Sequence, residues 1–257
     1  IERLLGHVFK KVFGITIKAP FERLEYAHAF ARYGSDKPDR RFALPITEVT
    51  DLFAATELSF LRQVIAKGGR VGALCVKGYA FSRSELEKLV ATTIKDFGAK
   101  GLLYIRFNED GSSDSPVAKF LPTDFLAKAR HLFPDLTASD TLLVVAGDYT
   151  PTWNSLGRLR LHLGDMLNLI DRTALDLHWV TKFPLLEWNE EEKRFYATHH
   201  PFTAPEDGWE KKNPKDLTAR AYDVVCNGEE LGGGSIRIHQ SSTPAKVFEL
   251  LGLEKAS

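Results

Sequence analysis

Residues 219–239 read ARAYDVVCNGEELGGGSIRIH, and this stretch decides the fold of the second half of the chain. Apolar and polar residues alternate from Ala221 to Cys226, which is typical of a half-buried strand. Asn227-Gly228 is a strong turn signal, and the alternation returns from Ser235 to His239. The stretch therefore predicts a β-hairpin.

Three side chains of this hairpin are candidates for chemistry: Asp223, Glu230 and Arg237. Arg237 lies between two isoleucines whose side chains point to the opposite face, so its guanidinium needs an anionic partner. The residues alone fit a structural ion-pair network, the commoner case, as well as a binding site. The glycine run 232–234 favours a site, because it weakens a strand and is best explained by a bulge or by a ligand close to the backbone.

The spacing of Glu230 and Arg237 raises a question of parity. The two are seven residues apart, so an unbroken strand would place them on opposite faces of the sheet. A bulge within the glycines would bring them to the same face.

Four motifs together resemble a known family. They are the hairpin, FPLLEW at 183–188, THHPFTAP at 198–205 and YGSDKPD at 33–39. In order and spacing they resemble the bacterial-type aspartyl-tRNA synthetases, which are class II aminoacyl-tRNA synthetases, and the resemblance covers nearly the whole chain. It implies an α+β fold: part of a class II antiparallel-sheet catalytic domain, interrupted by an inserted α+β domain of the GAD type. The implied boundaries are 1–45 for the first catalytic part, 46–150 for the GAD-like insertion and 151–257 for the second catalytic part.

The resemblance also implies roles for individual residues. Arg237 matches the arginine that receives the side-chain carboxylate of substrate aspartate, which a guanidinium fork binds through two parallel hydrogen bonds. His199, the first of a histidine pair, matches a residue that contacts the same substrate. Glu230 matches an acid that engages ATP and its magnesium, and Asp223 a second acid of that metal site. Gly232, Gly233 and Gly234 would leave space for the adenylate and the tRNA end, and no catalytic side chain is implied.

The implied function is that of an aspartate–tRNA ligase. Aspartate attacks the α-phosphate of ATP to give aspartyl-adenylate, and a terminal ribose hydroxyl of tRNA then takes the aspartyl group. ATP and Mg²⁺ are the implied cofactors. The implied partners are L-aspartate and tRNA(Asp), with tRNA(Asn) left open, and the parent family is homodimeric.

The chain also departs from the family pattern. Lys182 stands where the family usually has an aspartate before FP. The anticodon-binding barrel and motifs 1, 2 and 3 are not found, and the chain opens on Ile1 within a helical pattern. We therefore expect an internal fragment that is inactive alone. Two alternatives stay open: a non-catalytic tRNA- or protein-binding paralogue or truncated product, and a scaffold whose acids and arginine only pair with each other.

Composition narrows the broad class. The 257 residues carry 34 basic and 34 acidic side chains, which argues against a nucleic-acid-binding surface over the whole molecule. Cys75 and Cys226 lie far apart in apolar runs, as expected of buried free thiols in a reducing compartment. No apolar run reaches the roughly 18 residues needed to cross a bilayer, so a cytoplasmic protein is expected. His199 and His200 are adjacent, so they point apart and predict no shared metal.

Periodicity and capping signals predict the remaining elements, with a capping box at Ser82 to Glu85 and a C-terminal stop at Gly14. Helices are expected at Ile1–Phe13, Tyr26–Tyr33, Ser82–Phe97, Asp124–Leu132, Trp153–Leu169 and Ala245–Leu251, and strands at Val71–Val76, Leu102–Phe107, Thr141–Ala146 and His178–Phe183. Pro184 limits the last strand to an edge or an end.

Overall fold

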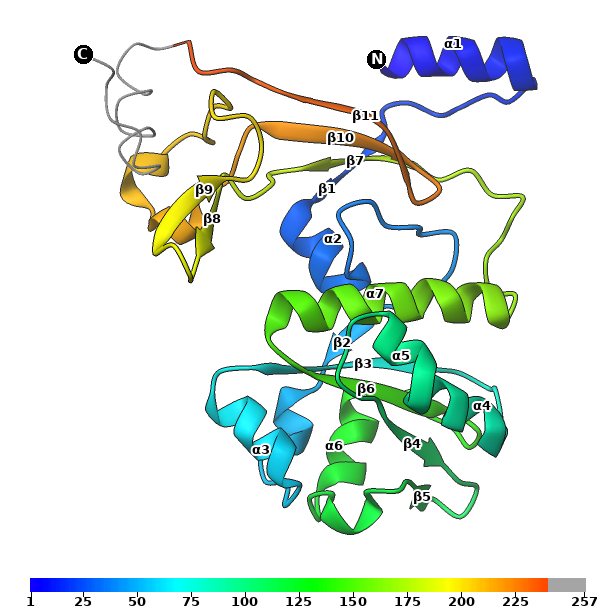
Figure 1. The fold of residues 1–257 in the computed structure, drawn as a ribbon. Coiled ribbons are helices and arrows are strands. Elements are labelled where there is room, and N and C mark those ends of the chain that lie inside the picture. The colour runs from blue at the N-terminus through cyan, green and yellow to red at the C-terminus, as the bar shows by residue number, and fades with distance from the viewer. Residues whose placement is uncertain (240–257) are drawn as a thin grey trace. The chain divides into compact units, whose positions relative to one another are not determined.

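The computed structural model describes residues 1–239 of the protein, and the chain forms two compact units (Figure 1). Unit 1 takes residues 1–29, 36–39 and the chain from residue 175 onward, and unit 2 takes residues 30–35 and 40–174. These limits differ from the boundaries expected at 45/46 and 150/151. The expected helix Ala245–Leu251 lies outside the described residues.

Unit 1 is built on a four-stranded sheet in the order β1-β7-β10-β11. Its strands are β1 (Glu22–Glu25), β7 (Leu177–Thr181), β10 (Ala221–Cys226) and β11 (Glu229–Ser235). β1 and β7 run parallel, whereas the other two pairings are antiparallel. β7 is thus an inner strand, not an edge, and Pro184 follows its end, where no ladder N–H is needed. A separate hairpin joins β8 (Leu186–Asn189) to β9 (Arg194–Ala197).

The predicted hairpin is present as β10 and β11, joined by Asn227-Gly228. Both turn residues have positive φ, 53° and 87°, which a two-residue hairpin turn requires. The return strand begins at Glu229, however, and not at Ser235 as predicted. The short turn brings Glu229 directly opposite Cys226, so the three glycines lie inside the strand and are paired by the backbone ladder.

A β-bulge sets which side chains of β11 share a face. Val225 pairs with Glu230 and Val224 with Gly232, so Leu231 is the extra residue. The bulge therefore lies just before the glycines, not within them as expected. Opposed residues of an antiparallel pair project to the same side, so Glu230 lies on the face of Val225 and Asp223.

The strand after the bulge carries Arg237 to that same face. Ser235 pairs with Ala221. Ala221 is two residues from Asp223, so the two side chains point to the same side of β10, and Ser235 lies on that side as well. The chain beyond Ser235 stays extended, because the Ile236 N–H donates to the Arg220 carbonyl and the Ile238 N–H to the Phe202 carbonyl. Asp223, Glu230 and Arg237 therefore share one face of the sheet, which we call the carboxylate face.

The opposite face of the unit 1 sheet packs against helix α1 (Glu2–Phe13). Phe21, Trp179 and Val224 form a small core with Leu5 of α1 against it. The helix ends at Gly14 in the left-handed region (φ 71°), as its sequence predicts. Because α1 side chains are half-buried or exposed, this face is only partly covered by the helix.

Unit 2 is built on a five-stranded antiparallel sheet in the order β2-β3-β6-β4-β5. Its strands are β2 (Ile46–Glu48), β3 (Arg70–Val76), β4 (Leu103–Phe107), β5 (Ser113–Asp114) and β6 (Thr141–Gly147). Its helices are α2 (Tyr26–Tyr33, shared with unit 1), α3 (Ser59–Ala66), α4 (Arg83–Lys88), α5 (Ile94–Asp96), α6 (Phe125–Leu132) and α7 (Tyr149–Met166).

Helices cover both faces of the unit 2 sheet (Figure 1). On one face, Leu61 of α3 and Phe125 of α6 join Val71, Ile105 and Val144 in the main buried cluster. On the other, α7 lies so close to β3 that a Cβ on Gly72 would be 2.5 Å from Leu156. This packing places α7 in unit 2, whereas residues from 151 onward were expected in the second catalytic part.

Arg160 fixes α7 to the segment before β2. Its side chain is 1% exposed, and its guanidinium lies 3.8 Å from the centre of the Phe42 ring. Nε–H donates to the Leu44 carbonyl at 2.9 Å and Nη2–H to the Phe42 carbonyl at 3.0 Å. A buried cation is stable only with such partners, so Arg160 is a structural residue.

The expected helix from Ser82 to Phe97 is one continuous coil with a change of pitch. The predicted capping box is confirmed, because Ser82 accepts from the Glu85 N–H while the Glu85 carboxylate accepts from the Ser82 N–H. Between α4 and α5, residues Leu89–Thr93 form a π-helical turn. The apolar periodicity contains no signal for that turn.

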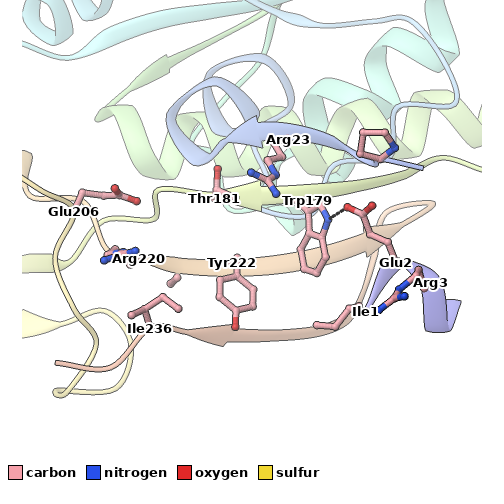
Figure 2. A pocket seen from close by; sticks show the side chains of 12 residues that line it. Ile1, Glu2, Arg3, Arg23, Trp179, Thr181, Glu206, Arg220, Tyr222 and Ile236 are labelled. Carbon is pink, nitrogen blue, oxygen red and sulfur yellow. Dashed lines mark hydrogen bonds between the residues drawn. The ribbon is translucent and has the colours of Figure 1, made fainter. Parts of the chain in front are cut away.

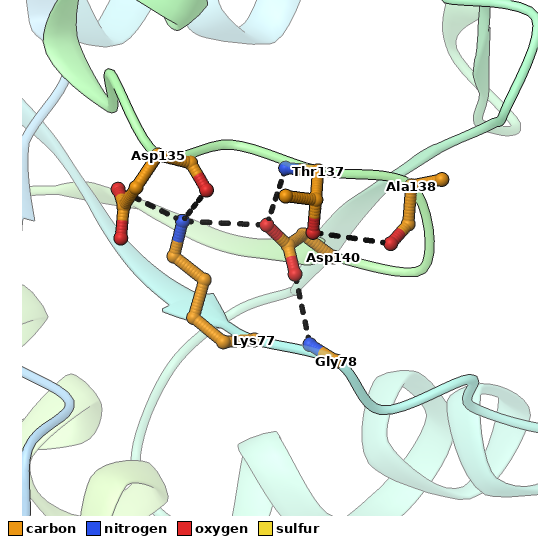
Figure 3. A network of polar contacts seen from close by, with 6 residues as sticks. All are labelled: Lys77, Gly78, Asp135, Thr137, Ala138 and Asp140. Carbon is orange, nitrogen blue, oxygen red and sulfur yellow. Dashed lines mark hydrogen bonds and ion pairs between the residues drawn. The ribbon is translucent and has the colours of Figure 1, made fainter.

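A buried carboxylate ties two loops of unit 2 together (Figure 3). Asp140 is fully buried and accepts from the backbone N–H of Gly78 and of Thr137, both at 2.8 Å. Lys77 Nζ lies 3.3 Å from the same carboxylate and 3.1 Å from the exposed carboxylate of Asp135. This satisfied network holds the end of β3 against the turn before β6.

No helix within residues 1–239 is both long and apolar enough to cross a membrane.

Cys75 and Cys226 are free thiols. Both were expected to be fully buried, but each is only half-buried. Burial raises the pKa of the Cys75 thiol to about 11, so that thiol stays protonated and unreactive near neutral pH.

Candidate functional site

Two carboxylates meet above Gly233 on the carboxylate face. Gly233 is paired with Asp223 across the hairpin. A Cβ built on Gly233 would lie 2.0 Å from Oδ1 of Asp223 and 3.3 Å from Oε1 of Glu230. The absent side chain is therefore the space into which both acids project, and any larger residue would displace them.

The electrostatics of Asp223 follow from this arrangement. Partial burial, the charge of Glu230 and the charge of Asp36 raise the pKa of Asp223 to about 6, while Lys37 opposes the shift. Like charges close together disfavour ionisation of one of them. The pair is thus an unfavourable concentration of negative charge that a cation would relieve.

The loop Ser35–Asp39 is a part of this site to which the sequence assigned no role beyond its place in the YGSDKPD motif. Residues 36–39 belong to unit 1, although both flanking segments belong to unit 2. A Cβ on Gly228, in the hairpin turn, would lie 3.0 Å from Cβ of Asp39. Asp36 and Lys37 act electrostatically on Asp223, so their charges in the YGSDKPD motif were the signal that could have revealed them.

The two adjacent histidines have different surroundings, as predicted. His199 packs edge to face on Phe183, with ring centroids 5.0 Å apart. Partial burial of this ring lowers the pKa of His199, and the carboxylates of Asp36 and Glu230 oppose that shift. His200 instead accepts from the Phe202 N–H through Nδ1 at 3.2 Å. His200 is therefore structural, and His199 lies within the electrostatic influence of Asp36 and Glu230.

Arg237 is on the carboxylate face but is not beside the acids. It lies four residues beyond Gly233, or about 13 Å along an extended strand, and its backbone pairs with Thr203. Its side chain is exposed and forms no ion pair with any residue in the described part of the chain. The guanidinium is thus available for an anion that is not supplied by residues 1–239.

The three glycines differ in their surroundings. A Cβ on Gly232 would meet no atom within 4 Å, whereas one on Gly234 would lie 3.1 Å from the Tyr222 hydroxyl. Gly233 makes room for the acids, as described above. The space that the sequence analysis assigned to the whole run is therefore open at Gly232 and occupied by protein side chains at the other two.

Lys182, the departure noted in the sequence, has a local partner. Its Nζ bonds the carboxylate of Glu25 at the end of the neighbouring strand β1, and this hydrogen bond raises the pKa of Lys182. The cation is thus neutralised locally, and it is not a counter-ion for Asp223 or Glu230.

The carboxylate oxygens of the site suit a hard cation that is also bound by a substrate. Among residues 1–239, no group of three or more His, Cys, Asp or Glu side chains is arranged to hold a metal ion. Two carboxylates alone match the way Mg²⁺ binds in proteins, where one or two carboxylates act together with substrate phosphates and water. The site can therefore hold a phosphate-bound magnesium at Asp223 and Glu230, and an anion at Arg237.

Comparison with known proteins gives the family. The family model described as tRNA synthetases class II (D, K and N) matches residues 1–257. The chain is 43% identical over 262 residues to the aspartate–tRNA(Asp/Asn) ligase of Persephonella marina, covering 98% of this chain and 43% of that protein. It is 44% identical over 258 residues to the aspartate–tRNA ligase of Agathobacter rectalis, covering 99% of this chain and 43% of that protein.

A third relative agrees with these two. The aspartate–tRNA(Asp/Asn) ligase of Aquifex aeolicus is 41% identical over 267 residues, covering 98% of this chain and 44% of that protein. The chain spans less than half the length of the curated relatives that it matches. With its antiparallel hairpin sheet and its acid-bearing face, the chain belongs to the class II tRNA synthetases of the D, K and N group.

Proposed function

We propose that this chain supplies part of the amino-acid activation site of an aspartate–tRNA ligase. The observation that carries the proposal is the bulge at Leu231, which brings Glu230 and Arg237 to one face with Asp223. A cation-binding end and an anion-binding end then lie about 13 Å apart along the strand. This suits an elongated ligand that has a polyphosphate at one end and a carboxylate at the other.

Each residue has a distinct task in this proposal. Arg237 receives the side-chain carboxylate of L-aspartate through two parallel hydrogen bonds, and an uncharged amide in that place would leave the guanidinium unpaired. His199, held by Phe183, contacts the same substrate. The glycine run 232–234 presents backbone without side chains along the strand where the adenylate and the tRNA end would approach. The reaction needs no protein nucleophile, so these residues act by positioning and by stabilising charge.

Asp223 and Glu230 would hold the magnesium of bound ATP. Their convergence over Gly233 and the raised pKa of Asp223 fit a site completed by a divalent cation. When bound, magnesium neutralises phosphate charge and orients the polyphosphate. The two carboxylates also repel the phosphates in its absence, so ATP and the metal are expected to bind together.

The proposal extends to partners and to unit 2. The relatives from Persephonella marina and Aquifex aeolicus are named for tRNA(Asp/Asn), and that from Agathobacter rectalis for tRNA. We assign tRNA(Asp) as the acceptor, with tRNA(Asn) as a second acceptor to be tested, and a homodimer as the assembly. Unit 2 is the GAD-like insertion domain in this proposal.

Pyrophosphate exchange with aspartate and ATP tests the function. We expect exchange from the protein in which this chain is joined to its flanking coding sequence, and none from residues 1–257 alone. In the active protein, Arg237→Lys loses one of two charge-assisted hydrogen bonds, worth about 1.5–3 kcal/mol, so the KM for aspartate should rise about tenfold to a hundredfold.

Arg83→Lys is the matched control, since it alters an exposed arginine of unit 2 that pairs with Glu87. It should leave the KM for aspartate unchanged. An unchanged KM in Arg237→Lys would refute the assignment of Arg237. Absence of exchange in the longer protein as well would favour a non-catalytic binding protein over a ligase.

A further inference from the structure

Two hydroxyl groups lie on the carboxylate face between Arg237 and the paired acids. Thr203 Oγ1–H donates a hydrogen bond to Ser235 Oγ at 3.2 Å. Thr203 opposes Arg237 in an antiparallel bridge, and Ser235 lies two residues before Arg237 in the chain. Opposed residues, and residues two apart in a strand, project to the same side of a sheet. The sequence analysis singled out neither hydroxyl.

The residues on the other face agree with this placement. Ile236, between Ser235 and Arg237, lines a pocket on the opposite face of the sheet together with Tyr222 (Figure 2). Tyr222 directly precedes Asp223 in β10. Because the side chains of consecutive residues in an extended segment alternate between faces, Ser235, Arg237 and Asp223 all project to the carboxylate face.

The burial of Thr203 decides how this hydroxyl pair can be used. Thr203 is 1% exposed, so its hydroxyl hydrogen needs an acceptor inside the protein, and Ser235 Oγ is that acceptor. A serine hydroxyl also has a hydrogen of its own to donate. Among residues 1–239, the Ser235 hydroxyl donates to no acceptor. Since Ser235 is only half-buried, this hydrogen is available to a ligand over the strand.

Ser235 lies at the middle of the elongated site. Along an extended strand it is about 7 Å from Arg237 and about 7 Å from Gly233, above which the two acids meet. In the proposed function, on which this step rests, Arg237 holds the side-chain carboxylate of aspartate and the acids hold the magnesium of ATP. The part of the ligand over Ser235 is then the α-carbon of aspartate and its carboxylate. A carboxylate accepts hydrogen bonds strongly, whereas the α-ammonium group only donates them.

We propose that Ser235 binds the α-carboxylate of L-aspartate and that Thr203 is a positioning residue for the Ser235 hydroxyl. Ser235 O–H donates to the carboxylate oxygen that does not attack phosphorus, while Ser235 Oγ accepts from Thr203. A hydroxyl that accepts one hydrogen bond donates a stronger one, so the two side chains act as a unit.

The reaction determines which kinetic constant reports on this bond. One α-carboxylate oxygen forms a bond to the α-phosphorus of ATP, and pyrophosphate leaves. The carboxylate loses negative charge in this step, so a donor on its other oxygen stabilises the bound substrate at least as much as the transition state. Loss of the Ser235 hydroxyl should therefore raise the KM for aspartate without lowering the maximal rate.

Pyrophosphate exchange, measured on the protein that joins this chain to its flanking coding sequence, gives both constants. Ser235→Ala loses a hydrogen bond to a charged group, so the KM for L-aspartate should rise about tenfold. Thr203→Val keeps the side-chain shape without the hydroxyl, and a smaller rise of about threefold is expected. Ser84→Ala, which removes an exposed hydroxyl from α4 of unit 2, is the control and should change nothing. Melting temperatures show whether each variant stays folded.

Two further measurements separate this role from a general loss of stability. Because Thr203 acts through Ser235, adding Thr203→Val to Ser235→Ala should raise the KM no further. The competitive inhibitor 3-aminopropanoate keeps the ammonium group and one carboxylate of aspartate but lacks the α-carboxylate. Its inhibition constant should be the same for wild type and Ser235→Ala.

The outcomes distinguish this assignment from the function on which it rests. An unchanged KM in Ser235→Ala, or an equal loss of affinity for 3-aminopropanoate, would overturn the role of Ser235. If Arg237→Lys still raised the KM for aspartate, the proposed function would stand. Additive effects in the double variant would overturn the role of Thr203. Absence of exchange in the wild-type protein would overturn both the function and this assignment.

Discussion

Gly233 is the position where the structure makes its sharpest prediction. In Gly233→Ala the new methyl group would stand 2.0 Å from Oδ1 of Asp223. To reach an ordinary contact of 3.4 Å, the carboxylate must move by about 1.4 Å. Asp223 has only two side-chain torsions and Val224 and Val225 hold its strand in the core, so the move forces an unfavourable rotamer.

The expected cost is that of overpacking a small space, about 1–3 kcal/mol in free energy of unfolding. Alanine is otherwise better than glycine inside a strand by about 0.5–1 kcal/mol. The same substitution in an Asp223→Ala background should therefore be neutral or stabilising. The predicted coupling energy between the two sites is about 1–3 kcal/mol.

Urea unfolding of the four proteins of this double-mutant cycle measures the coupling. Gly232→Ala is the matched control, because its methyl group meets no atom within 4 Å, and it should cost nothing in either background. If Gly233→Ala costs the same with and without Asp223, the carboxylate does not occupy the space above the glycine. The site geometry described here would then be wrong.

Four further predictions concern stability. The pKa of Asp223 is raised to about 6 from 3.8, so the folded state holds this proton more tightly than the unfolded state. The free energy of unfolding should therefore fall as pH rises from about 4 to about 6. Urea unfolding should show Asp223→Asn more stable than wild type at pH 7 but not at pH 4. Asp140→Ala leaves the backbone N–H groups of Gly78 and Thr137 without their acceptor and removes one of the acceptors of Lys77, so it should cost about 3 kcal/mol in the same assay. Asp135→Ala, which removes the exposed carboxylate near Lys77, should cost less than about 1 kcal/mol. Arg160→Met should lower the melting temperature of unit 2 in calorimetry, with a cost of about 2–4 kcal/mol, because the carbonyls of Leu44 and Phe42 lose a buried donor.

Most helices and strands could be predicted from the sequence, because the residues that determine them are neighbours in the chain. The capping box at Ser82 and the stop at Gly14 appear in the structure as expected, since both depend on a few neighbouring residues. The return strand of the hairpin was placed too late, because three glycines have low strand propensity. Backbone pairing with β10 overrides that propensity here.

Features that depend on distant contacts were not predictable in the same way. The need for a bulge followed from the parity of Glu230 and Arg237, but its position at Leu231 depends on how β11 aligns with β10. The contribution of Asp36 depends on contacts between the loop 35–39 and the hairpin, which lie far apart in sequence. The packing of α7 on β3 is likewise a contact between distant segments, and periodicity alone does not show which sheet a helix covers.

The order of segments in the chain has a consequence for biosynthesis. β1 pairs in parallel with β7, and all of residues 40–174, the main part of unit 2, lie between these strands in the sequence. During translation every residue of unit 2 is synthesised before β7 and emerges from the ribosome ahead of it, and domains generally fold as they emerge. A nascent chain arrested when unit 2 has emerged but β7 is still inside the ribosome should therefore carry a protease-resistant unit 2 joined to an N-terminal segment that is still cleavable. Within residues 1–239, unit 1 becomes resistant after unit 2.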